Sequence, residues 1–243
     1  MTATVNPNKN YIAFLFSNGS SATFDRLNNP VVTREDGQSG QLSPEDLALK
    51  FAINHVGQAA NATDAASQQA YANMLAGVAT TWLAIVAMSG TPNSIAQPAL
   101  PNGTLVDPIT VTSLRSEFAH GIWSIDKSAG QPGGVGNNIH DPLTGNWVLK
   151  IHPDAVNAYQ ALPGGMEYLI AHELGHNSTG GLAAQLYFYS TWQSSESTTV
   201  PTYGPDSTNW KNNEVYANLS AYNITTFLNQ PHMSNPHHGY LWF

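Results

Sequence analysis

The chain contains no cysteine among its 243 residues. This absence excludes disulfide bonds, thiolate ligands for a metal ion and a cysteine nucleophile. A chain of this length can still bury a substantial hydrophobic core, and 42% of its residues are hydrophobic.

Charged residues are also scarce, at 10% of the chain against about 25% in a typical protein. There are 8 basic and 16 acidic residues, which give a formal net charge of −8. The sequence has no basic patch, so we expect no nucleic-acid partner. The surface must be rich in Asn, Gln, Ser and Thr, a composition that favours an exported protein.

The sequence predicts neither a signal peptide nor a membrane span. Residues 1–9 lack a basic start followed by an apolar run, so we expect secretion or export without a recognisable signal peptide. Residues 11–16 are apolar but few, and predict a buried strand. Residues 74–88 fall short of the ~20 apolar residues of a span and lack charged flanks, which predicts a buried core helix.

The N-terminal part of the chain is predicted to be β-like over its first forty residues and helical afterwards. Ser43 and Pro44 form a strong helix start, and the apolar pattern predicts a helix to about residue 58. A second helix is predicted over residues 64–88. Residues 91–108 contain four prolines and predict a long irregular connection.

Short elements are predicted beyond this connection. Residues 111–118 predict a helix, residues 121–125 a strand, residues 131–138 a loop and residues 141–145 a turn. Residues 147–151 alternate in hydropathy and predict a strand, which we expect to be an exposed sheet edge that holds an extended substrate.

We expect a single domain over residues 1–243, with residues 1–90 as a helical N-terminal part and residues 109–243 as the catalytic part.

The most informative motif is H-E-x-x-H at residues 172–176. The apolar residues before it predict a helix, residues 162–165 a break in front of that helix, and residues 177–181 a stop behind it. Residues four apart on a helix lie about 40° apart around its axis, so His172 and His176 can bind one Zn²⁺. Glu173 is then placed to act as a general base on a zinc-activated water.

The third zinc ligand must come from further along the chain. The extended motif H-E-x-x-H-x-x-G-x-x-H fails, because Thr179 and Leu182 stand where it has glycine and histidine. Residues 212–222 predict a helix that places Glu214 and Asn218 on one face, with Glu214 as the ligand.

Two other acids remain open as the third ligand. Glu196 has a suitable distance from His176 along the chain, but residues 194–199 predict a loop. Asp206 is a further alternative.

The H-E-x-x-H motif at residues 172–176 and the predicted helix over residues 212–222 together resemble the gluzincin branch of the zincin metallopeptidases. In that family a second helix supplies a zinc-binding Glu, often preceded by Asn and followed four residues later by an acid. Asn213 and Glu214 match this pattern, and Asn218 replaces the acid. The resemblance implies an α+β, zincin-like fold, in which helices pack on a small mixed sheet and a central helix carries H-E-x-x-H.

The resemblance also implies a zinc-dependent metallopeptidase whose partner is a protein or peptide substrate. Zincins commonly place a Tyr or His across the zinc to stabilise the oxyanion. The open candidates for that role are His237, His238, Tyr216, Tyr222 and Tyr240. The remaining histidines are expected to be structural, namely His55, His120, His140 and His152.

Two alternative functions remain open at this point. One is a zinc amide hydrolase that acts on a non-protein substrate such as a cell-wall peptide. The other is a catalytically inert binding domain, against which the intact Glu173 argues.

Overall fold

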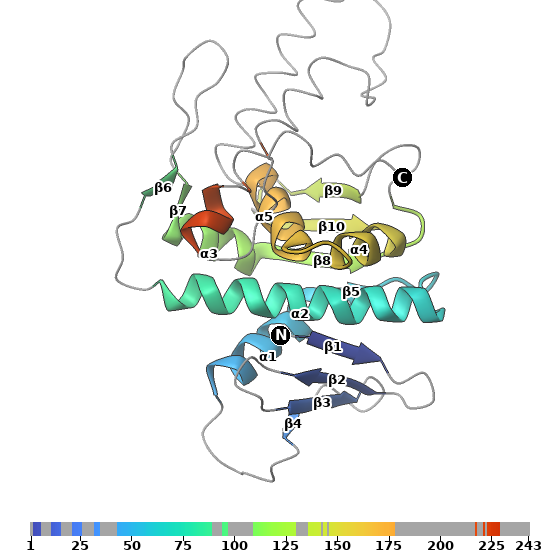
Figure 1. The fold of residues 1–243 in the computed structure, drawn as a ribbon. Coiled ribbons are helices and arrows are strands. Elements are labelled where there is room, and N and C mark those ends of the chain that lie inside the picture. Colours follow the sequence, from blue (N-terminus) through green and yellow to red (C-terminus); the bar gives the residue numbers. More distant parts are fainter. Residues whose placement is uncertain are drawn as a thin grey trace, which may run out of the picture.

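The chain folds as a mixture of helices and small sheets, an α+β arrangement (Figure 1). The computed structural model describes residues 2–5, 11–15, 21–25, 32–34, 43–88, 94–96, 109–129, 136–141, 143–144, 146–177, 217, 221 and 223–228.

Four short strands form the first sheet. They are β1 (Thr2–Val5), β2 (Tyr11–Leu15), β3 (Ser21–Asp25) and β4 (Val32–Arg34), paired antiparallel in chain order. The predicted β character of the first forty residues is confirmed for these segments. Among the described elements, α2 is the helix that lies closest to β1 (Figure 1).

Helix α1 (Pro44–His55) begins as its sequence predicts but ends earlier. The side chain of Ser43 accepts a hydrogen bond from the backbone N–H of Asp46, while Asp46 accepts one from the N–H of Ser43. This capping box fixes the start of the helix. The expected continuation to residue 58 is wrong, because β5 (Val56–Gln58) instead pairs with a strand of the second sheet.

Helix α2 (Ala65–Ala87) differs from its predicted bounds by one residue at each end. The Asp64 side chain caps it by accepting the N–H of Ser67 at 3.1 Å. Within the described residues α2 alone is long and apolar enough to cross a membrane, yet 67% of its most apolar window is buried inside the fold. It lies between the first sheet and the layer that holds the second sheet, α4 (Pro153–Gln160) and α5 (Gly165–Asn177) (Figure 1).

Part of the connection after α2 is ordered into a two-stranded sheet. Strand β6 (Ser94–Ala96) pairs antiparallel with β7 (Ile109–Thr110), so the prediction of a wholly irregular segment is wrong for these residues. Helix α3 (Val111–His120) follows directly, and Thr110 caps it by accepting the N–H of Ser113.

The second sheet has the order β5-β8-β10-β9. Strands β5, β8 (Gly121–Ile125) and β10 (Trp147–Ile151) run parallel, and β9 (Gly136–His140) pairs antiparallel with β10. The bounds of β8 and β10 match the predictions, and the sheet is small and mixed as expected.

One prediction about this sheet is wrong. Strand β10 lies between β8 and β9 and is not an edge, so the outer strand among the described residues is β9. Residues 136–138, predicted as loop, form part of β9 because a turn at Asp141 brings them back along β10. The N–H of Asp141 donates to the carbonyl of Asn146 at 2.8 Å, and the Asp141 carboxylate accepts the N–H of Leu143.

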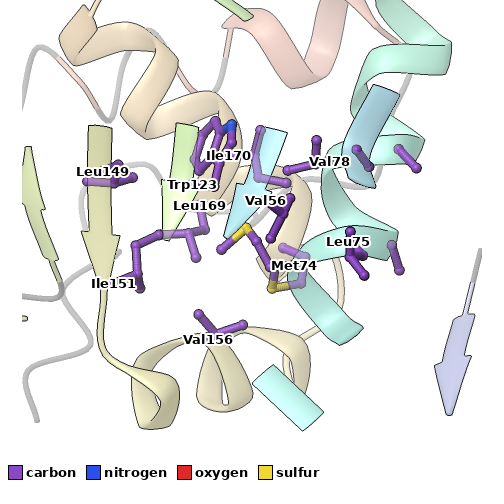
Figure 2. Packing of buried hydrophobic residues seen from close by; sticks show 14 of the residues in the cluster. Val56, Met74, Leu75, Val78, Trp123, Leu149, Ile151, Val156, Leu169 and Ile170 are labelled. Carbon is purple, nitrogen blue, oxygen red and sulfur yellow. The ribbon is translucent and has the colours of Figure 1, made fainter. Parts of the chain in front are cut away.

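One hydrophobic core joins the second sheet to the helices around it. Its members come from the inner face of the sheet and from the facing sides of α2, α4 and α5 (Figure 2). The labelled members are Val56, Met74, Leu75, Val78, Trp123, Leu149, Ile151, Val156, Leu169 and Ile170. The core therefore fixes the position of α5, which carries the H-E-x-x-H motif.

Candidate metal centre

Helix α5 starts at a tight turn after α4. Gly164 has a φ of 70°, a conformation that glycine adopts without steric cost. At Gly165 an added Cβ would overlap the carbonyl of Tyr159, so the turn also needs a residue without a side chain there. The predicted break before the motif and the helical state of the motif are both confirmed.

The two motif histidines point toward the same place. Their Nε2 atoms lie 3.1 Å apart, and their rings stand nearly perpendicular, at 83°, with centroids 4.7 Å apart. Both side chains are half-buried. Without a metal, this distance corresponds to a hydrogen bond in which one ring carries the proton and the other accepts it.

The same pair can bind a metal ion. A tetrahedral zinc ion about 2.0–2.1 Å from each nitrogen holds the two nitrogens about 3.3–3.4 Å apart. The distance of 3.1 Å between the Nε2 atoms of His172 and His176 is within a few tenths of an ångström of that separation. These two side chains therefore fit a zinc ion with only a small rotation of either ring, provided that both nitrogens are deprotonated.

Glu173 lies beside this pair on the same turn of α5. Its side chain is largely buried, with 8% exposed. The last turn of the helix is held by Asn177, whose Nδ2 donates to the backbone carbonyl of Glu173 at 2.9 Å. Asn177 is fully buried, so the backbone that carries Glu173 and His176 is tied into the interior.

Tyr168 extends the row of rings one turn toward the helix start. Its ring centroid lies 6.2 Å from that of His172, and the Tyr168 side chain is 1% exposed. Tyr168, His172 and His176 follow one another at intervals of four residues, so they share one face of α5. The buried tyrosine thus packs its ring near that of the first histidine.

The remaining predicted site residues lie outside the described residues. These are Glu214, Glu196, Asp206, Asn218, Tyr216, Tyr222, His237, His238 and Tyr240. Of the helix predicted over residues 212–222, the structure describes Ala217 and Ala221, both helical and fully buried. In the described part of the chain, no three His, Asp or Glu side chains gather at one point, so the described candidate ligands are the two histidines.

The contacts of His55, His120 and His152 are local, whereas the side chain of His140 lies outside the described residues. The Nδ1 atoms of His55 and His120 lie 2.7 Å from the carbonyls of Phe51 and Ser116, one helical turn earlier. The His152 side chain accepts the N–H of Asp154 at 3.2 Å and caps α4.

Two carboxylates with unusual surroundings were not singled out from the sequence. Burial raises the pKa of Glu117 to about 7, although the nearby His120 acts in the opposite direction. Asp126, which is 4% exposed, accepts hydrogen bonds from Asn61 and Ser128 and pairs with Lys150 at 3.3 Å. These partners hold the pKa of the Asp126 carboxyl well below its usual range.

Only Asp126 had a signal in the sequence, because it directly follows a predicted strand and begins an Asp-Lys-Ser turn. The raised pKa of Glu117 comes from burial in the folded chain, which the residues around it in sequence do not indicate.

Comparisons with known proteins gave no match: no family model, no curated protein and no solved structure is similar to this chain.

Proposed function

We propose that this chain is a zinc-dependent metallopeptidase with a gluzincin-like site on a zincin-like fold. The observation that carries the proposal is the pair of Nε2 atoms, 3.1 Å apart on one face of a buried helix, with Glu173 beside them. A small mixed sheet that shares its core with this helix is the arrangement that the resemblance implies, and it supports the fold assignment.

His172 and His176 would hold the zinc ion through their Nε2 atoms. Zinc bound there supplies Lewis acidity, which polarises a carbonyl group and lowers the pKa of a bound water to about 7. Tyr168 packs its ring near that of His172, and Asn177 holds the turn that carries His176. The chain thus keeps two nitrogen donors oriented in advance.

Glu173 would move the proton in the reaction. Its carboxylate takes a proton from the attacking water while the water oxygen forms the new bond to the carbonyl carbon. It then passes that proton to the nitrogen as the carbon–nitrogen bond breaks, so a carboxylic acid and an amine leave. Its largely buried position limits solvent around the carboxylate, which strengthens its interactions with reacting groups.

We propose Glu214 as the third protein ligand. Its support comes from the sequence: Asn213 and Glu214 stand at family-like spacing, and Glu196 lies among residues that favour a loop. Ala217, three residues after Glu214, is helical and buried. Helical Ala217 and Ala221 support the helix predicted over residues 212–222, on which Glu214 is expected.

Metal analysis with an activity assay tests this function. We expect one zinc per chain in protein purified without chelator, and loss of both zinc and casein hydrolysis after chelation, with recovery when zinc is added. Protein that holds no stoichiometric transition metal and takes up no zinc contradicts the proposal. Peptidoglycan tested beside casein separates the two hydrolase classes, and zinc binding without hydrolysis of either substrate indicates the inert domain.

A further inference from the structure

A hollow outside the metal centre lies between α2, α4 and strand β1. Its volume is about 440 Å³, within the range of about 300–1,000 Å³ that is typical of ligand sites. Seven described residues line it, the four amides Gln69, Asn73, Asn157 and Gln160 and three alanines. Among these described residues none belongs to α5, which carries the histidine pair.

Three of the amides form a hydrogen-bonded chain. Gln69 donates to the Oδ1 of Asn73 at 2.9 Å, and Asn73 donates to the Oδ1 of Asn157 at 3.1 Å. Asn157 in turn donates to the backbone carbonyl of Ala66 at 3.0 Å. Each donor amide uses one of its two N–H groups, and the side-chain oxygens of Asn73 and Asn157 each accept one bond, so N–H groups and lone pairs remain for a ligand.

Gln160 completes the rim of the hollow. Its side chain is exposed, and among the described residues it makes no hydrogen bond. The bonds between α2 and α4 therefore do not depend on it. Asn73, in contrast to Gln160, has only 6% of its surface exposed, and its neighbours hold its side chain in place.

The lining limits the chemistry of the ligand. What its described residues offer a ligand is the hydrogen-bonding groups of four amides and the small apolar surface of three alanines. An amide offers a donor next to an acceptor, and so does each pair of neighbouring hydroxyl groups on a sugar ring.

We propose that this hollow binds an uncharged saccharide through its four amide side chains. The hydroxyl groups of the sugar take up the donors and acceptors that the amide chain leaves unused, and Gln160 adds a contact from the rim. On a chain that hydrolyses amides, such a site would favour a substrate attached to glycan.

The test is a titration of isotope-labelled protein with small uncharged probes. Binding is monitored through the NMR signals of the side-chain NH₂ groups. The probes are tri-N-acetylchitotriose, cellotriose and an uncharged trialanine with blocked ends. Concentrations rise to about 10 mM, at which a ligand with a dissociation constant of about 1 mM nearly fills its site. Binding is measured directly, so the result is independent of whether the chain hydrolyses anything.

We expect the signals of Gln69 and Gln160 to shift with at least one of the two saccharides. Gln160→Ala should weaken that binding by about three- to tenfold, the effect of losing one hydrogen bond. Gln68→Ala is the matched control, because Gln68 adjoins Gln69 on α2 but donates to the backbone carbonyl of Thr63 and is not among the described residues that line the hollow. The proposal is overturned if neither saccharide shifts these signals, if blocked trialanine binds more tightly, or if Gln68→Ala weakens binding as much as Gln160→Ala.

Discussion

The indole of Trp147 covers Gly121, its direct partner on the neighbouring parallel strand. A Cβ at Gly121 would overlap the six-membered ring of this indole. The Trp147 side chain is 1% exposed, stands edge-on to Trp123, and donates its Nε1–H to the carbonyl of Glu117 at 3.0 Å. The glycine thus leaves the space that one of the largest buried side chains of the sheet occupies.

Gly121→Ala should therefore destabilise the fold. The added methyl group must displace a rigid ring that is packed and hydrogen-bonded, and overpacking of this kind costs about 1–3 kcal/mol. Urea unfolding followed by tryptophan fluorescence measures the loss. The environment of Trp147 should change at the same time.

Gly57→Ala is the control for this variant. Gly57 lies on β5, and a Cβ there meets no atom nearer than 4.0 Å. We expect its free energy of unfolding to stay within about 0.5 kcal/mol of the parent or to rise. Equal losses in both variants would mean that a side chain at any glycine of this sheet is harmful and that the indole is not the cause.

Glu117 should make stability depend on pH. Its pKa is raised from 4.5 to about 7 by burial, so the folded protein binds the proton more tightly than the unfolded chain. Its contribution to the free energy of unfolding is complete below about pH 4.5 and is lost as the pH rises through 7. Glu117 is half-buried, so solvent screening keeps the full change below the roughly 3 kcal/mol of a completely buried group.

Glu117→Gln removes this titration and should flatten the loss of stability between pH 4.5 and 7. Denaturant midpoints of both proteins across this range provide the comparison. Parallel curves would show that Glu117 does not carry the pH dependence.

Glu173→Gln should keep the fold and the zinc but lose hydrolysis. General-base catalysis is typically worth 10²–10⁴-fold in rate, and glutamine cannot accept the proton. Glu167→Gln, on the first turn of the same helix, is the matched control and should retain activity. Wild-type hydrolysis by the Glu173 variant would remove this residue from the mechanism.

Glu214→Ala should weaken zinc binding, whereas Glu196→Ala should not. A carboxylate ligand lies about 2.0–2.2 Å from zinc, and its loss leaves the two histidines as the remaining protein ligands. Zinc-affinity titrations of the two variants in parallel decide between the acids. Loss of zinc by Glu196→Ala alone would place the third ligand in residues 194–199.

Elements with strong local signals could be predicted from the sequence. The side chain of Ser43 caps α1 as the predicted helix start indicates, and the turn at Asp141 precedes β10 as expected. The arrangement of His172 and His176 also follows from helix geometry alone, because four residues complete little more than one turn.

Elements that depend on distant partners could not be predicted. Residues 56–58 continue an apolar helical pattern, but pairing with β8 draws them into a strand. Gly136 and Asn137 have low β-propensity, and they become part of β9 only because Ile151 and Lys150 lie opposite them. The same reason applies to the pKa of Glu117, which depends on burial by the folded chain.

The parallel pairing of β5, β8 and β10 has a consequence for the rate at which the chain folds. Val56 must find Trp123, and Trp123 must find Leu149, before this sheet exists, and all of α2 lies between the first two. Contacts between residues so far apart in the chain require large loops to close early, which slows folding. We expect refolding to take longer than in helical bundles of equal stability, with α2 forming its first turns well before the strands meet.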